Sequence, residues 1–561
     1  MIKKFSTAFL LIIALAFSAR VIFLDRIPSG VSTDEIDYIL TAKSVFLSGS
    51  DISHTWNPFS LTTPQSSFPQ AELPPLVTFW LIGPLPLGLF TSKIVYSLFS
   101  TGIVGLLMLI VKKLIGEKEA ILVGLVGALN PWLIFFGRTA YDVSIAVFFL
   151  LLAFYILLTF KKWKIFLAFP SFILAFYCYI GMKLILLPFA AVIIYFAWSQ
   201  NKKYKKQYIF LFIACIILFA FYIYSSLHTP GVRLNELASP NMSSITGVVN
   251  DERRLSVKSP LTAIFSNKYI IFFKYSISKY LNAFSPNLLF LNGDGEQRFS
   301  VWIHGLFYYL DAIFLIIGSA VLFARKRSVF TLLLALSLIA PIPSVMSSVG
   351  NSYAVRSMFL APIFIILIGV GIFFIIKKYN FTKLVIIIAY FLLFLNFFNI
   401  YFLRNPIYNS QSFNFSGRIL AKYLSYQHGS TYVIDDNPRT PFKEYIFFNN
   451  ALNRNTSNKI ADDYKHKEFG VNNIHFITCK QSSEISKGSV VIYGGCASIH
   501  PSKSEVTIAQ LSDGGSIYSI QNDKICSQYK LERYPNSFKF SDLSVERMPE
   551  KLFCQKFITK Y

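Results

Sequence analysis

Residues 92–111 read SKIVYSLFSTGIVGLLMLIV, and Lys112 and Lys113 follow at once. Lys93, the charged residue of this stretch, stands near its beginning. An α-helix of about 20 apolar residues covers the roughly 30 Å hydrocarbon core of a bilayer. The stretch therefore predicts a membrane-spanning helix, and the lysine pair indicates the side of the membrane on which it ends.

Similar stretches recur through most of the chain. Hydrophobic residues make up 54% of its 561 residues, charged residues only 15%, and the mean hydropathy is +0.51. An ordinary soluble domain has about 25% charged residues, so a disordered chain, a collagen and a single soluble globule are excluded. We predict about eleven spans, near residues 5–24, 92–111, 119–137, 140–160, 164–180, 183–199, 208–226, 302–324, 329–346, 358–376 and 382–402.

Basic residues in alternate loops predict the orientation of these spans. The amino-terminal segment and the loops after every second span hold 18 Lys and Arg residues but only two acids. The positive-inside rule places them in the cytoplasm. We expect a multi-pass protein of the plasma or inner membrane, with an uncleaved first helix and long outer loops at 25–91 and 227–301. This orientation signal explains much of the net charge of +24, so nucleic acid is not an expected partner.

The composition changes after the last predicted span. Residues 403–561 carry 20 basic and 14 acidic residues and contain no spanning run. A helix is expected at 417–425, and β-rich runs follow at 431–434, 474–478, 490–493 and 516–520. The predicted fold class is a polytopic α-helical membrane protein, residues 1–402, with an extracytoplasmic α/β domain at 403–561.

The six cysteines divide between these two parts. Cys178 and Cys215 lie in apolar spans, where they are expected to pack as small apolar residues. The carboxyl-terminal domain holds the other four, Cys479, Cys496, Cys526 and Cys554. An even number on the oxidising side predicts two disulfides, with three pairings open. Zinc is the rival interpretation, but no C-x-x-C spacing supports it.

Two neighbouring carboxylates, Asp34 and Glu35, follow the first span directly in the segment Ser32-Thr33-Asp34-Glu35. Adjacent like charges raise each other's pKa, which suits a general base. The structural alternative is a helix start, with Ser32 or Thr33 as the N-cap and acids in the first turn.

A third carboxylate, Glu72, stands near the end of the same loop. Pro74 and Pro75 follow it, and a helix cannot run through this Pro-Pro step from the preceding residues. The two prolines are therefore expected to fix the chain where it re-enters the membrane and to hold Glu72 at the membrane surface. Asp34 and Glu72 are also candidate ligands for a divalent cation, the one cofactor that we consider.

The order of these motifs resembles that of the GT-C membrane glycosyltransferases, closest to the protein O-mannosyltransferase and aminoarabinose-to-lipid-A transferase group. The resemblance covers about residues 5–402. Leu73 and Tyr353 depart from it, because the family usually has Lys or His at the first position and His at the second. The matching segments are Asp34-Glu35, Glu72 before Pro74-Pro75-Leu76, Asn130-Pro131-Trp132 with Arg138 and Asp142, Asn292–Arg298, Ala340–Pro343 and Tyr353–Ser357.

The resemblance implies an inverting transfer of a sugar from a polyprenyl-phosphate donor to a glycan, lipid or protein acceptor. Asp34, Glu35 and Glu72 would serve catalysis. The candidate donor-phosphate ligands are the basic residues that the predicted orientation places outside, Arg138, Lys183, Arg298 and Arg356. Membrane anchoring explains Arg138 and Lys183 equally well, and solvation explains Arg298. No nucleotide-binding glycine motif occurs, which agrees with a lipid-linked donor.

Two other classes of protein stay open at this point. A flippase or transporter predicts charges near the middle of the membrane and similar halves, whereas this sequence concentrates its polar groups in outer loops. A non-catalytic assembly protein of the cell envelope needs no pairing between Asp34 and Glu72.

Overall fold

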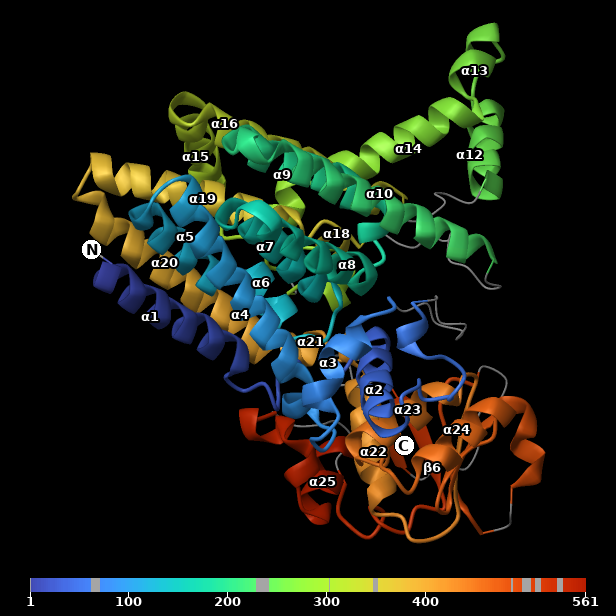
Figure 1. Ribbon diagram of the computed structural model, residues 1–561. Helices are drawn as coiled ribbons and strands as arrows, with labels where there is room; N and C mark the ends of the chain where they lie inside the picture. The colour runs from blue at the N-terminus through green and yellow to red at the C-terminus, as the bar shows by residue number, and fades with distance from the viewer. Residues whose placement is uncertain are drawn as a thin grey trace.

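The computed structural model describes residues 2–61, 71–228, 242–301, 303–346, 352–485, 488–496, 506–509, 516–531 and 538–560. Parts of the two long predicted outer loops, 62–70 and 229–241, lie outside these ranges, and so does 347–351 between two predicted spans. The chain forms a bundle of long helices with a mixed helix and sheet domain at one end (Figure 1). We call this end, where α2 and the carboxyl-terminal domain lie, the domain end of the bundle.

The bundle is that of a multi-pass membrane protein. Six helical stretches of the described chain are long and apolar enough to cross a membrane, and the bent pair α5 and α6 would make a seventh. The shorter apolar helices α1, α7, α8 and α15 fall on other predicted spans. The predicted count of eleven is therefore not established by helix length. The bundle helices are α1 (Ile2–Val21), α4 (Leu89–Leu114), α5 (Glu117–Leu129), α6 (Pro131–Gly137), α7 (Val143–Thr159), α8 (Ala168–Cys178), α9 (Met182–Gln200), α10 (Lys205–His228), α15 (Asp311–Arg325), α16 (Arg327–Ile339), α19 (Leu360–Lys378) and α20 (Thr382–Phe398).

Short helices connect these elements and carry most of the polar residues of interest. α2 (Thr33–Ser48) and α3 (Pro74–Ile82) lie at the domain end, and α17 (Ile342–Met346) contacts α18 (Tyr353–Arg356). An arm of three helices, α12 (Met242–Arg254), α13 (Pro260–Phe265) and α14 (Lys268–Asn282), projects from the bundle (Figure 1).

The helix ends away from the domain are basic. Lys112 and Lys113 close α4, and Lys377 and Lys378 close α19. Lys326 donates to the free carbonyl oxygens of Leu114 and Ile115, at 2.9 and 3.2 Å. These lysines complement the negative end of the helix dipole, and Lys326 satisfies unpaired carbonyl groups.

The carboxyl-terminal domain contains one seven-stranded sheet in the order β2-β3-β1-β4-β6-β5-β7. β3, β1 and β4 are parallel and the outer pairs are antiparallel. The four β-rich runs and the helix predicted from sequence are all present. The elements are α22 (Phe415–Ser425), β1 (Thr431–Asp435), α23 (Arg439–Phe448), α24 (Ser457–His466), β2 (Phe469–Val471), β3 (Ile474–Thr478), β4 (Val490–Tyr493), β5 (Val506–Ala509), β6 (Ser516–Gln521), α25 (Glu550–Phe557) and β7 (Ile558–Lys560).

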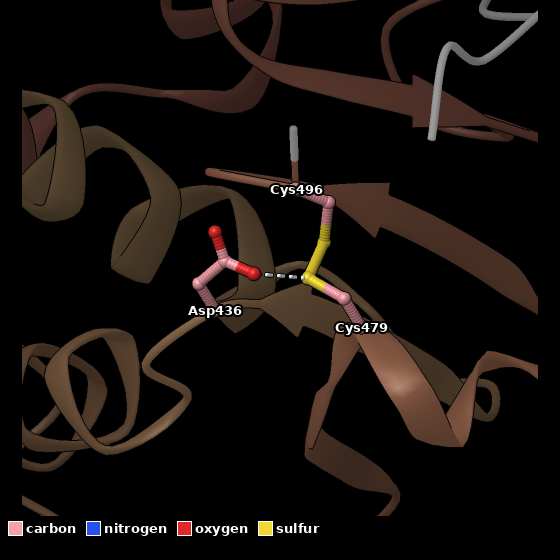
Figure 2. A group of neighbouring side chains, drawn as sticks. All are labelled: Asp436, Cys479 and Cys496. Carbon is pink, nitrogen blue, oxygen red and sulfur yellow. Dashed lines mark hydrogen bonds between the residues drawn. A yellow bond between two sulfur atoms is a disulfide. The ribbon is translucent and has the colours of Figure 1, made fainter. Parts of the chain in front are cut away.

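The prediction of two disulfides is confirmed, and the structure gives the pairing. Cys479 bonds Cys496, which joins the segments that leave β3 and β4 (Figure 2). Cys526 bonds Cys554 and ties α25 to the domain. Cys178 and Cys215 are free and buried in the bundle, as expected.

A buried acid in this domain makes its stability depend on pH. Glu444 on α23 is only 3% exposed, and its carboxyl group packs against Gly417 of α22. Its Oε2 has no hydrogen-bond partner among the described residues. Burial, and then the charge of Asp435, raise the pKa of Glu444 from 4.5 to about 8. The folded domain therefore binds this proton more tightly than the unfolded chain, and stability is lost as pH rises from about 4.5 to about 8.

We predict that Glu444→Gln stabilises the domain at high pH only. The amide needs no deprotonation, so the gain should be on the order of 3 kcal/mol at pH 8.5 and close to zero at pH 5. Thermal unfolding of the full-length protein at the two pH values measures this difference. An equal gain at both values would show that Glu444 does not titrate in this range.

Candidate functional site

The two neighbouring carboxylates at the start of α2 have different environments. Ser32 is the N-cap and forms a capping box with Glu35, whose Oε2 accepts from the Ser32 N–H at 2.8 Å. Glu35 is fully buried, and its Oε1 accepts from the Ala140 N–H at 2.7 Å and lies 3.5 Å from Lys93 Nζ. Asp34 is exposed. The structural interpretation therefore accounts for Glu35, and Asp34 is the carboxylate that a substrate can reach.

The charge of Asp34 acts on an arginine from a distant loop. Arg298 is half-buried and forms an ion pair with Glu296 at 2.8 Å. Burial opposes its charge, but Asp34 and Glu296 outweigh this effect and raise the pKa of Arg298. A carboxylate and a guanidinium that are both reachable from solvent thus lie within electrostatic range.

Tyr141 joins the segments that carry these two charges. Its hydroxyl donates to the Arg298 carbonyl oxygen at 2.9 Å and lies 3.1 Å from Ser32 Oγ, two residues before Asp34 in the chain. The neighbouring Asp142 accepts from the Tyr38 hydroxyl at 2.7 Å, one turn along α2. The segment around Tyr141 therefore sets the distance between α2 and the Arg298 loop.

A second arginine, Arg356, lies on α18, a short helix that the Arg298 loop contacts. Burial lowers the pKa of Arg356, and so does Arg298, whereas Tyr179, Asp294 and Glu296 raise it. Asp294 also fixes the loop geometry, because its Oδ2 accepts from the Ala354 N–H at 2.6 Å. Burial raises the pKa of Asp294 to about 6, although backbone N–H groups oppose this shift. The Arg298 loop and α18 thus form one structural unit that holds both arginines.

Glu72 and Lys183 form a separate, buried pair. Glu72 Oε2 lies 2.9 Å from Lys183 Nζ, and both side chains are at most 3% exposed. Lys183 also donates to the Phe176 carbonyl oxygen and lies over the rings of Tyr177 and Tyr222. The loop reaches α2 through Tyr38, whose hydroxyl accepts from the Ala71 N–H at 3.0 Å.

This pairing bears on the expected metal site. A cation held between Asp34 and Glu72 would have to share Glu72 with the Lys183 ammonium, which already supplies a positive charge there. These two carboxylates therefore do not fit a shared divalent cation. Among the described residues one other group, Asp436, Cys479 and Cys496, lies close enough to hold an ion, but its two cysteines form a disulfide (Figure 2).

Arg138 is fully buried and is occupied by backbone carbonyl groups. Its guanidinium donates to the oxygens of Arg20 at 3.0 Å, Ile22 at 2.8 Å and Ile27 at 2.9 Å. It therefore organises the segment between α1 and α2, which sets where Asp34 lies. These contacts leave Arg138 less suited to a donor phosphate than Arg298 or Arg356.

Sequence reasoning missed Lys93, Tyr38 and Tyr141 as parts of this site. Lys93 was visible as a lone charge in an apolar span, which signals a buried partner. Tyr38 follows Asp34 by four residues and therefore lies on the same side of a helix. Nothing in the sequence indicated that Tyr141 would contact both Ser32 and Arg298.

The comparisons with known proteins return membrane glycosyltransferases by structure alone. No protein-family model and no curated protein matches the chain. The Archaeoglobus fulgidus oligosaccharyltransferase in the apo form is similar with a TM-score of 0.41 and 12% identity, covering 79% of this chain and 64% of that one. Its complex with Zn and sulfate has a TM-score of 0.43 and 10% identity, covering 87% of this chain and 68% of that one. ArnT from Cupriavidus metallidurans bound to undecaprenyl phosphate has a TM-score of 0.41 and 11% identity, covering 92% of this chain and 98% of that one.

These are glycosyltransferases of the GT-C type, the class to which the sequence motifs point. The chain spans somewhat less than two thirds of the apo oligosaccharyltransferase. The assignment of a reaction therefore rests on the residues of this site.

We predict unequal effects on stability for the two neighbouring acids. Glu35→Gln leaves the buried ammonium of Lys93 without its counter-charge, so the protein should lose roughly 3 kcal/mol of stability. Asp34→Asn, at an exposed position, should change stability by less than about 0.5 kcal/mol. Thermal unfolding of the full-length protein measures both. A stable Glu35→Gln protein would contradict the structural role given to Glu35.

Proposed function

We propose that this protein is an inverting glycosyltransferase that moves a sugar from a polyprenyl-phosphate donor to an acceptor hydroxyl at the outer face of the membrane. One observation carries the proposal. Asp34 is exposed at the domain end of a membrane bundle, and Tyr141 ties the backbone of Arg298 to Ser32, two residues before Asp34. The loop of Arg298 in turn holds α18, which carries Arg356, through Asp294. The remaining acidic and basic candidates, Glu35, Glu72, Lys183 and Arg138, have buried structural partners.

The two arginines suit a phosphate leaving group. When the bond between the sugar and the phosphate breaks, negative charge develops on the phosphate oxygens, and fixed cations stabilise it. Guanidinium groups bind phosphate oxygens through paired N–H groups. A lipid tail would lie in the bilayer beside the bundle, and its phosphate would lie at the membrane surface, where this site is located in our orientation.

The reaction follows from the placement of Asp34. The carboxylate takes the proton of the acceptor hydroxyl while the hydroxyl oxygen attacks the anomeric carbon of the donor. The bond from this carbon to the phosphate oxygen breaks, and its electron pair leaves with the polyprenyl phosphate. Attack from the side opposite the leaving group inverts the configuration. No step in this scheme requires a metal ion.

In this scheme Glu72 and Lys183 support the site rather than react. Each neutralises the other in a buried pair, so neither supplies a free base or a free cation. Their pair fixes the end of the first outer loop against α8 and α9. The loop then presents its backbone to Tyr38 and so to α2.

We predict the orientation of the chain from its basic loops. A cysteine in place of Ser199, at the end of α9 and just before the basic run 202–206, should resist a membrane-impermeant thiol reagent added to intact cells. A cysteine in place of exposed Asn455 in the carboxyl-terminal domain should react. Mass spectrometry of the labelled protein measures both, and the reverse pattern would overturn the orientation and, with it, an outward-facing site.

We predict that Asp34→Asn lowers turnover of a polyprenyl-phosphate sugar by about 10²–10⁴-fold, because this is the usual effect of removing a general base. Binding of undecaprenyl phosphate, the donor without its sugar, should change little. Arg356→Ala is the matched comparison and should weaken both binding and turnover, because it removes a phosphate ligand. Near-normal turnover by Asp34→Asn would remove the catalytic assignment and favour a flippase or an assembly protein.

A further inference from the structure

The carboxyl-terminal domain reaches the helix that carries Asp34. α2 packs against α23 and α24 of the domain, as Figure 1 shows near the label of α23. At this interface Lys443 of α23 forms an ion pair with Asp37 of α2. The lysine side chain is 3% exposed and the aspartate side chain 9% exposed, so water scarcely reaches the pair.

Lys443 also acts on Asp34. Asp34 and Asp37 are three residues apart on a helix and so share a face. Burial lowers the pKa of Lys443, and the charges of Asp37 and Asp34 oppose this effect. Arg298 from its loop and the Tyr141 hydroxyl are also within the electrostatic range of Asp34, and Asp37 shares its helix face. Arg439 of α23 acts on Lys443 as well and adds to the lowering of its pKa.

Lys443 and Lys93 hold α2 from nearly opposite sides. At 100° per residue, Glu35 and Asp37 project about 160° apart around the helix axis. Glu35 pairs with Lys93 inside the bundle, and Asp37 pairs with Lys443 of the domain. Asp34 projects between these two directions, on the side of Asp37. Two buried ion pairs of this kind prevent the helix from rotating about its axis.

The domain also forms hydrogen bonds to the chain segments that come before and after α2. Before α2, the Ser29 carbonyl oxygen accepts from Arg418 at 2.6 Å, and Arg418 is held by Glu546 at 2.6 and 2.7 Å. After α3, the Leu87 N–H donates to Asn450 at 2.8 Å. The interface at Lys443 therefore belongs to a rigid connection rather than to a passing surface contact.

We infer that Lys443 is a positioning residue for the proposed transfer: the carboxyl-terminal domain uses it to hold Asp37, and thereby Asp34, in the working orientation. This inference rests on the proposed function and extends it, because it makes the domain a part of the active site. A buried ion pair is costly to break, since the remaining charge stays buried without a partner.

The first test measures the environment of position 34 without any substrate. In an Asp34→Cys protein the new thiol is the exposed one, since Cys178 and Cys215 are buried and the other four cysteines are paired. Its reaction with neutral iodoacetamide follows the thiolate fraction, so its pH dependence gives a midpoint. Adding Lys443→Met should raise this midpoint by about half a pH unit or more, because a nearby cation is lost.

Lys465→Met is the matched control, because Lys465 is an exposed lysine of the same domain that pairs within its own helix. It should leave the midpoint unchanged. An equal midpoint in the Lys443→Met and Lys465→Met proteins would show that Lys443 does not act on position 34 and would overturn the inference.

The second test measures how firmly α2 is held. Hydrogen exchange of residues 33–48 in the full-length protein should speed up tenfold or more in Lys443→Asp, which sets two acids against each other. The exchanged pair Asp37→Lys with Lys443→Asp should return exchange to within about threefold of the original protein. The inference fails if exchange of α2 is unchanged in Lys443→Asp, or if the exchanged pair restores nothing.

These outcomes are separate from the test of the proposed function. Normal turnover by Asp34→Asn would remove the reaction, whatever happens to α2. Unchanged exchange and an unchanged midpoint would remove the role of Lys443, whatever the turnover. If the proposed reaction and the role of Lys443 are both correct, Lys443→Met lowers kcat and leaves KM for the donor nearly unchanged, because the donor phosphate is bound by other residues.

Discussion

The burial of one carboxylate, Glu35, determines how the rest of the site is arranged. A buried carboxylate is stable only when charge and hydrogen bonds surround it. Glu35 obtains them from the Ser32 and Ala140 N–H groups and from Lys93. These partners belong to the start of α2, to the segment before α7 and to α4. One side chain thus brings three parts of the chain together, and the neighbouring Asp34 is left facing outward.

Buried arginines meet a related requirement at the breaks between helices. Backbone groups without helical partners need hydrogen bonds when no water reaches them, most of all at membrane depth. Arg20 donates to carbonyl oxygens of Ala16, Gly127 and Ala128, and Arg138 donates to three at the end of α1 and in the segment after it. Their charges therefore serve the backbone, which explains why a basic residue near the site is not always a ligand.

Local patterns predicted the elements of this fold well. Apolar length identified most helices of the bundle, alternation identified four strands, and the location of the cysteines identified two disulfides. The pairing of the cysteines stayed open, because it depends on which strand ends meet. The partnership of Glu72 with Lys183 was missed for the same reason: 111 residues separate them, and only the packing of α8 and α9 brings them together.

The roles of the charged residues likewise depend on contacts between distant parts of the chain, which local patterns do not reveal. From spacing alone, a helix start explained Asp34 and Glu35 as well as catalysis did, and anchoring or solvation explained Arg138, Lys183 and Arg298 as well as phosphate binding did. Partners in the folded structure distinguish them, since a charge already neutralised in a buried pair is poorly suited to a new one.

The same reasoning applies to the domain at 403–561, which has no catalytic motif of its own that we could identify from sequence. Asp37 needs a buried cation, and the bundle commits Lys93 to Glu35, so the ammonium comes from Lys443 of the domain. A helix held by one ion pair can still turn about it, whereas two pairs on nearly opposite sides fix its rotation. Asp34 then has a defined direction only when bundle and domain are both folded.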